Sequence, residues 1–173
     1  MEWRKQVMAE LEKCLQENGV RTESAGELLQ FVIEGIGNRK EWKALGQALF
    51  VPYTSAGEEE EIFQIYMTVA QNVDSEKKER LAVKLMELND GAVFGRFGMN
   101  GMGQIFYQTR FPIVGQDLPM VKKTFEFVLF EMVTFLDAFY AYLLVIINEP
   151  EKLTLARYTE LMLTEEDGTD EEE

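Results

Sequence analysis

The chain has 173 residues, which is enough for one hydrophobic core and too few for two independent domains of ordinary size. Apolar residues make up 46% of the chain, and this excludes disorder of the whole chain. The formal net charge is -14, histidine is absent and Cys14 is the only cysteine, which excludes an internal disulfide, most zinc sites and every nucleophile that needs a histidine base.

The first half of the chain shows the patterns of a helix and a three-stranded antiparallel meander. Apolar residues at helical spacing predict a helix over residues 2–18. Alternation of apolar and polar residues then predicts three strands, joined by short loops, over residues 28–36, 45–53 and 62–70. The acidic run at residues 58–61 is expected to be the loop before the third strand.

A second helix and a β-hairpin are predicted next. An apolar stripe at helical spacing over residues 76–91 ends in Asn-Asp-Gly, which is a typical helix stop. Two strand-like runs, over residues 92–99 and 104–114, flank Asn100 and Gly101. Asn-Gly between two such runs is among the strongest hairpin signals.

The longest predicted helix covers residues 118–148, with Asp117 as its N-cap. Residues 125–147 are mostly apolar and long enough to cross a bilayer, but the acidic residues among them bring the free energy of insertion close to zero. We therefore expect a deeply buried helix of a soluble protein. On a helical wheel the acidic side also carries Phe127 and Phe130, so the apolar surface is wider than one sheet can cover. The C-terminal segment, a second copy or a client must cover the rest.

Together the elements predict an α+β fold with the order αβββαββα, in which helices pack on an antiparallel sheet of about five strands. Residues 1–148 form this single domain, and residues 149–163 add a helical segment. Seven of the last nine residues are acidic, and we expect residues 164–173 to be a disordered, solvated tail.

No arrangement of residues in the sequence predicts catalysis, a cofactor site or a metal site. The glycines at 95–103 lack the spacing of a phosphate-binding loop and are interpreted as hairpin glycines. Glu126 and Asp137 lie about 16 Å apart along the long helix, too far to share a proton or a metal, and are interpreted as solvated. Cys14 lies on the apolar side of the first helix, where a free cysteine is most often a small core residue.

Several short motifs in the second half of the chain resemble those of a known family. They are Leu85-Met86-Glu87-Leu88-Asn89, Gly95-Arg96-Phe97, Asn100-Gly101, Ile105-Phe106-Tyr107 and Phe111-Pro112-Ile113. With the element order and the size, they resemble the YbjN-like family of bacterial proteins and the related type III secretion chaperones, over residues 1–148. The resemblance implies a non-enzymatic protein that works through protein contacts, since type III chaperones are typically dimers that bind an extended client segment over apolar patches. It implies no catalytic residues.

The sequence therefore predicts a cytoplasmic, homodimeric protein-binding module of chaperone or adaptor type, with Phe94, Phe106, Phe127 and Phe130 as interface anchors. Its partner is expected to be a protein client. Nucleic acid is not expected because the sequence has no basic stripe, and an anionic membrane is disfavoured for the same reason. The alternative is a small-molecule sensor with a Met-rich and Phe-rich pocket between sheet and helices. An enzyme is the third hypothesis.

Overall fold

The computed structural model describes residues 2–37, 40, 42–55, 58–113 and 117–166, with the backbone alone at 54, 55, 58–61 and 164–166. Within these residues the chain forms four α-helices, one short 3-10 helix and six strands. The helices are α1 (Glu2–Glu17), η1 (Ser75–Lys77), α2 (Lys78–Gly91), α3 (Leu118–Asn148) and α4 (Leu155–Glu166). The strands are β1 (Arg21–Ala25), β2 (Leu28–Ile36), β3 (Trp42–Ser55), β4 (Glu58–Ala70), β5 (Arg96–Met99) and β6 (Ile105–Pro112).

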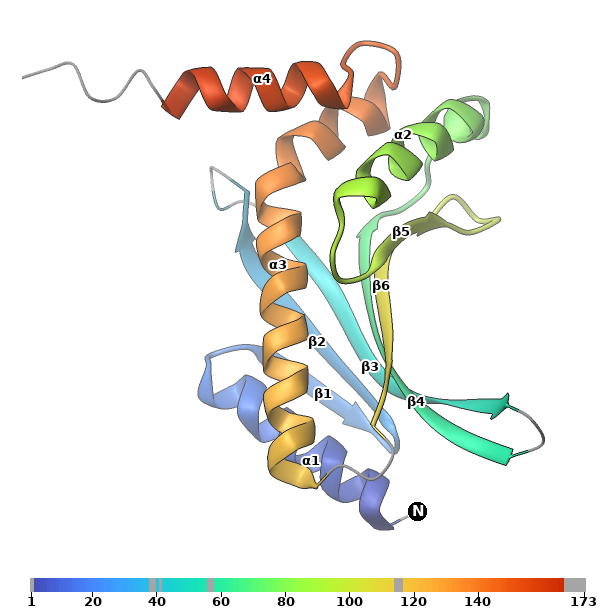
Figure 1. Ribbon diagram of the computed structural model, residues 1–173, viewed down its shortest axis with the longest axis vertical. Helices are drawn as coiled ribbons and strands as arrows, with labels where there is room; N and C mark the ends of the chain where they lie inside the picture. The colour runs from blue at the N-terminus through green and yellow to red at the C-terminus, as the bar shows by residue number, and fades with distance from the viewer. Residues whose placement is uncertain (1, 38–39, 41, 56–57, 114–116, 167–173) are drawn as a thin grey trace, which may run out of the picture.

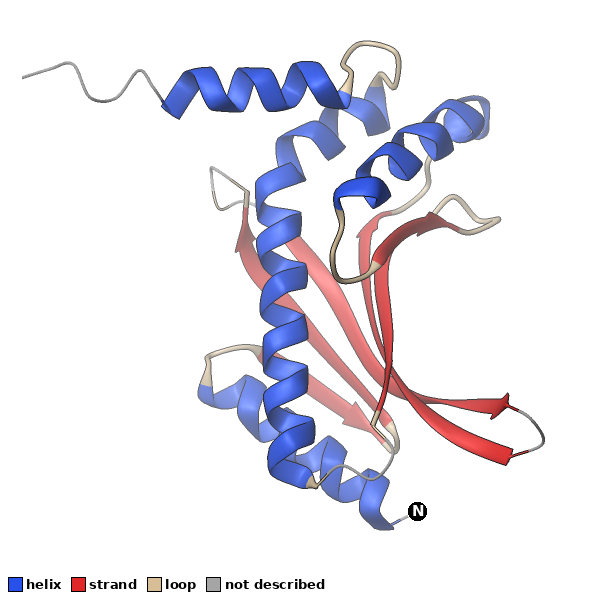
Figure 2. Ribbon diagram, viewed as in Figure 1, coloured by secondary structure: helices blue, strands red, loops and turns tan. Residues whose placement is uncertain are grey.

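All six strands belong to one antiparallel sheet with the order β1-β2-β3-β4-β6-β5. Helix α3 runs along one face of this sheet, with α1 across its lower end and α2 beside its upper end (Figure 1). Coloured by secondary structure, the fold is a layer of helices on a layer of strands (Figure 2). The predicted α+β class and element order are confirmed.

The core lies between this helix layer and the sheet. On β4 the alternate residues Phe63, Ile65, Met67 and Val69 are all buried, as the alternation predicts. Helix α1 contributes five buried residues, which are Val7, Met8, Leu11, Cys14 and Leu15. Helix α3 contributes nine, which are Val121, Phe125, Val128, Leu129, Met132, Leu136, Tyr142, Leu143 and Ile146.

The strand predictions are wrong in three places. Strand β1, at residues 21–25, is additional, since its polar sequence shows no alternation and it forms by pairing with β2. The acidic run 58–61 is the start of β4 and not a loop, because it pairs in register with the end of β3. Strand β5 begins only at Arg96, because the chain turns at Gly95 with a φ of +91°.

The hairpin and the caps follow the predictions more closely. Strands β5 and β6 pair antiparallel through a loop at residues 100–104, in which the Asn100 carboxamide oxygen accepts hydrogen bonds from the backbone N–H groups of Met102 and Gln104. The loop is therefore longer than a two-residue Asn-Gly turn. Asp117 caps α3 by accepting a hydrogen bond from the N–H of Met120 at 2.9 Å.

The C-terminal segment covers only one end of α3. Helix α4 lies across the top of α3 and projects beyond the body of the molecule (Figure 1). Tyr158 anchors it, because its ring lies against Phe139 and Tyr142 and its hydroxyl donates to the carbonyl of Ala138 at 2.9 Å. Helix α4 continues to Glu166, so residues 164–166 of the expected tail are helical. Residues 167–173 lie outside the described residues.

Helix α3 is less buried than predicted. Among the described residues it is the one helix long and apolar enough to cross a membrane, and 28% of its most apolar 18-residue window is buried. One side of α3 faces the core and the other faces outward, so the expectation of a deeply buried helix is wrong. The fold itself leaves the outward side of α3 uncovered.

Candidate interaction surfaces

The outward side of α3 carries an apolar stripe, which we call the outer stripe. Its members are Met120, Phe127, Phe130, Thr134, Ala138, Ala141 and Leu144. The side chains of Phe127 and Phe130 are 50% and 67% exposed, although phenylalanine is usually buried. Lys123 and Glu126 are the only charged residues among the exposed positions from 120 to 144. At 1.5 Å per residue the stripe is about 36 Å long.

Three of the four predicted anchors lie on this side of the molecule. The ring of Phe94, which precedes β5, meets the ring of Phe127 edge to face, with centroids 5.2 Å apart. Phe130 is three residues further along α3 and therefore a neighbour of Phe127 on the helix surface. The structure thus brings Phe94, Phe127 and Phe130 to one side, and places Phe106 on the sheet face away from the helices.

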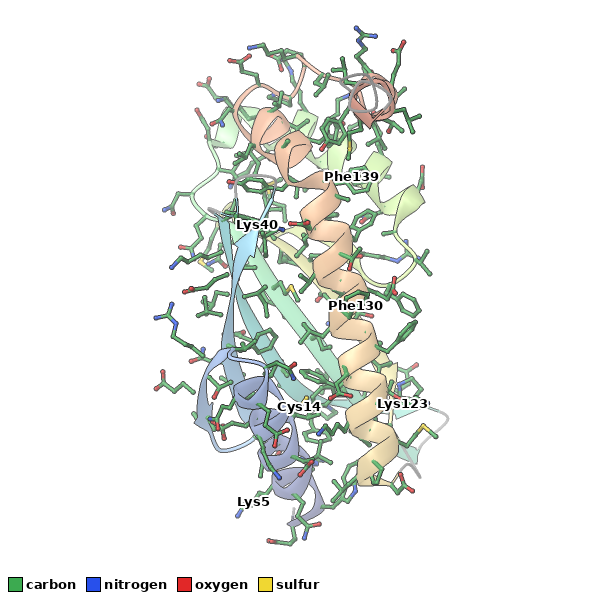
Figure 3. The ribbon with its side chains drawn as sticks, turned by 90° about the vertical axis from the view of Figure 1, so that its left-hand side faces the viewer. Lys5, Cys14, Lys40, Lys123, Phe130 and Phe139 are labelled. Atoms are coloured by element: carbon green, nitrogen blue, oxygen red, sulfur yellow. The ribbon has the colours of Figure 1, made fainter. Side chains whose placement is uncertain are left out.

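Phe130 also lines a groove between α1 and α3, whose volume is about 380 Å³. Figure 3 shows Phe130 on α3 and Cys14 between the two helices. The groove is mostly apolar, with Leu15, Ile33 and Val133 among its lining residues. The groove opens at the surface and reaches Ile33 of β2, whereas further into the layer between sheet and helices Phe63, Ile65 and Met67 fill the interior.

A side-chain hydrogen bond across this groove joins Cys14 of α1 to Glu126 of α3. The Cys14 thiol donates a hydrogen bond to a Glu126 carboxylate oxygen at 2.9 Å. Burial, and then this carboxylate, raise the pKa of Cys14 to about 12, so the thiol is protonated at neutral pH. The prediction of a buried cysteine is confirmed, while Glu126 is exposed but has a partner. Asp137 is also engaged, because it accepts a hydrogen bond from the N–H of Gly37 at 2.6 Å.

The second uncovered surface is the face of the sheet that points away from the helices, which we call the open face. Its apolar members are Leu28, Val32, Leu45, Leu49, Val51, Ile62, Tyr66 and Phe106, and none of them belongs to the core cluster. The rings of Tyr66 and Phe106 stack at 4.8 Å. Phe106 also lies over Gly98, where a Cβ atom would come within 2.5 Å of its ring. This explains the glycine on β5 and places Phe106 firmly on the open face.

Charges on the open face divide it into two parts. At its β1–β3 end, Glu34 is bound by Lys43 and Arg21, and these hydrogen bonds lower the pKa of Glu34. At its other end Arg96 and Arg110 are both exposed, and Arg110 Nε donates to the Gln64 carboxamide at 2.8 Å. Among the described residues, Gln64 is the one polar or charged residue that is buried.

Asn89, from the motif at residues 85–89, seals the outer edge of β5. Its carboxamide accepts a hydrogen bond from the N–H of Phe97 at 2.6 Å and donates one to the carbonyl of Phe97 at 3.1 Å. The side chain thus replaces a neighbouring strand at this edge. Sequence reasoning placed Asn89 at a helix stop and missed this role, because the partner is a backbone group brought close only by the fold.

Among the described residues no group of three or more histidine, cysteine, aspartate or glutamate side chains is placed to hold a metal ion. A wide cleft of about 790 Å³ separates α2 from α4, with Glu87, Asp90, Leu155 and Leu163 among its lining residues. The described residues that line this cleft include no arrangement of side chains that would support catalysis.

No known protein-family model matches the sequence, and a search of curated proteins found no match. The resemblance to YbjN-like proteins and type III secretion chaperones stays a prediction.

Proposed function

We propose that this chain is a non-enzymatic, cytoplasmic protein-binding module of chaperone or adaptor type that binds through the outer stripe of α3. Its partner is a second copy in a homodimer or an apolar segment of a client. The observation that carries the proposal is the exposure of Phe127 and Phe130 on a helix whose opposite side is in the core.

The two phenylalanines supply a useful binding free energy. A phenylalanine offers roughly 200 Å² of surface, so 50% and 67% exposure leave about 100 to 130 Å² on each ring. At about 25 cal/mol per Å², covering each ring contributes about 3 kcal/mol. Phenylalanine is among the aromatic residues that are enriched in the buried centres of protein interfaces.

The residues around the rings also suit helix packing. Thr134, Ala138 and Ala141 are small and lie on the same side of α3, so a partner helix can approach closely. An antiparallel partner of the same length would contact the stripe along its whole length. A second copy of α3 satisfies this requirement, as does an amphipathic client helix.

The proposal is tested by light scattering after size exclusion over a concentration series, with the double variant Phe127→Gln and Phe130→Gln. We expect the wild-type chain of 20.0 kDa to form a dimer or to bind reduced, carboxymethylated α-lactalbumin as a permanently unfolded client. The double variant should lose either interaction by more than about a hundredfold, because the roughly 3 kcal/mol removed at one ring alone already corresponds to a factor of that size.

The matched control is the double variant Val83→Gln and Met86→Gln on α2, where both side chains are also more than half exposed. It should behave as the wild type. The proposal would be contradicted if the protein is a monomer that binds no unfolded client. It would also be contradicted if the wild-type protein floats with neutral phospholipid vesicles and the Phe127 and Phe130 double variant does not.

The groove at Cys14 favours a second function, that of a small-molecule sensor. Its volume of about 380 Å³ is within the range of ligand sites, and its lining is mainly apolar. Native mass spectrometry of the purified protein should then show a bound small molecule that is lost in the variant Val133→Trp, which fills the groove. If the wild-type protein shows only the mass of the chain without a ligand under the same conditions, this second function is contradicted.

A further inference from the structure

The part of the open face formed by residues 62–68 of β4, by β6 and by β5 carries two arginines and, among the side chains that the structure describes, no acidic one. Its described members are Ile62, Gln64, Tyr66, Thr68, Phe106, Gln108, Arg110 and Arg96. Neither arginine forms an ion pair with a described residue, although the chain has 31 acidic residues and most of its described basic residues are paired with one. In a protein of net charge -14 this is an isolated positive area.

The two guanidinium groups are close enough to act together. Arg96 pairs in register with Gln108, and Arg110 follows two residues later on β6, so both arginines lie on one face as diagonal neighbours. Such neighbours have Cα atoms about 7 to 8 Å apart, within the reach of two arginine side chains that converge on one anion. A hollow of about 350 Å³ lies between them, lined also by Gly95 and Thr109.

The sheet also offers backbone groups at this place. Strand β5 pairs with β6 only from Ile105 to Gln108, and residues 109–112 have no strand beside them on that edge among the described residues. The chain leaves the line of β5 at Gly95. An extended segment of another protein therefore has room beside the end of β6.

The geometry points to a second binding site, separate from the outer stripe of α3, at which Arg96 and Arg110 bind an acidic, extended segment of a partner protein. The carboxylates of the partner point to the open face, where one of them lies in the hollow between the guanidinium groups, and the residues between them point to the opposite face of the sheet. Nucleic acid fits less well, because its affinity depends on many phosphate contacts and the rest of this acidic protein repels a polyanion. A short peptide needs only one or two charge pairs, and beyond about 8 Å the repulsion is screened at physiological salt.

The test is fluorescence anisotropy of the full-length protein with a labelled peptide of about ten residues that alternates glutamate and valine. A second peptide replaces every glutamate with glutamine. We expect the acidic peptide to bind at least about tenfold more tightly than the glutamine peptide, and the difference to shrink as salt is raised. The double variant Arg96→Gln and Arg110→Gln should lose this preference.

The matched control is the double variant Lys5→Gln and Lys123→Gln, which removes the same charge from exposed lysines of the helix layer (Figure 3). It should bind the acidic peptide within about twofold of the wild type. Because Arg110 contacts Gln64, Arg110→Lys is measured as well, and it should keep more of the affinity than Arg110→Gln if charge is the cause. Circular dichroism and thermal melting establish that each variant is folded.

Three results would overturn the site: equal affinity for the two peptides, unchanged affinity in the Arg96 and Arg110 double variant, or tighter binding of a single-stranded oligothymidine of similar length. The Phe127 and Phe130 double variant should still bind the acidic peptide. Failure of this site and failure of the outer stripe are therefore distinguishable.

Discussion

Replacing Asn89 should destabilise the protein by more than its position near the end of a helix suggests. Both polar atoms of its carboxamide bond to Phe97, the one buried aromatic residue of β5, which is 5% exposed. In Asn89→Ala the N–H and the carbonyl of Phe97 lose these partners. Each backbone group left without a partner costs about 1 to 3 kcal/mol, and partial access of water at this edge favours the low end.

The better helix propensity of alanine returns about 0.6 kcal/mol, so the expected net loss is about 1.5 to 3 kcal/mol in the free energy of unfolding. In a chain of this size that corresponds to a melting temperature lower by roughly 4 to 10 °C. Urea unfolding with linear extrapolation measures the loss, and amide exchange should show faster exchange at Phe97.

The matched control is Asn148→Ala, where one exposed hydrogen bond to the carbonyl of Leu144 is removed. It should cost about 0.5 kcal/mol or less. If Asn89→Ala costs no more than Asn148→Ala, Asn89 does not seal the edge of β5 and the reasoning is refuted. Asn89→Asp keeps the bond from the Phe97 N–H but sets a carboxylate oxygen against the Phe97 carbonyl, so it should be about as destabilising as alanine.

Three further predictions concern burial, packing and the C-terminus. The pKa of Cys14 is raised from 9.0 to about 12, so the stabilisation from its protonated thiol is complete below about pH 9 and is lost as the pH rises toward 12. The unfolding free energy of Cys14→Ala should therefore fall less steeply over that range than that of the wild type. An equal slope would contradict the raised pKa of Cys14. Gly46→Ala places a Cβ atom 2.1 Å from the ring of Phe31 and should lower the free energy of unfolding in urea by about 3 kcal/mol. The control is Gly91→Ala, whose new Cβ atom meets no other atom, so this variant should be neutral or stabilising. Equal effects of the two variants would show that Phe31 moves aside freely. Truncation after Glu166 removes five acidic residues and should leave the melting temperature within about 2 °C, and a larger drop would mean that the tail packs on the fold.

The predictable features are those that depend on local pattern. The alternation of residues 62–70 identified the buried side of β4 because side chains of a strand point to opposite faces in turn. The N-cap at Asp117 and the hairpin at Asn100 were predictable because capping and turn formation involve only a few neighbouring residues. The presence of phenylalanines on the polar side of α3 already indicated a helix with more apolar surface than one sheet covers.

The features that sequence reasoning missed depend on partners far along the chain. Strand β1 and the start of β4 have sequences without strand character, and each forms because a neighbouring strand offers its edge in register. The pairing of Asn89 with Phe97 and of Arg110 with Gln64 arises from the sheet order and the packing of α2 on β5.

The sequence by itself determined the class of the fold, the order of its elements and the excess of apolar surface, because periodicity and capping are local. Tertiary structure alone decided which apolar residues are left uncovered. It placed α4 over only one end of α3, which exposes Phe127 and Phe130, and it left Tyr66 and Phe106 on a sheet face that carries no helix. Exposure is a property of the assembled layers, since a side chain is buried only if another element lies against it.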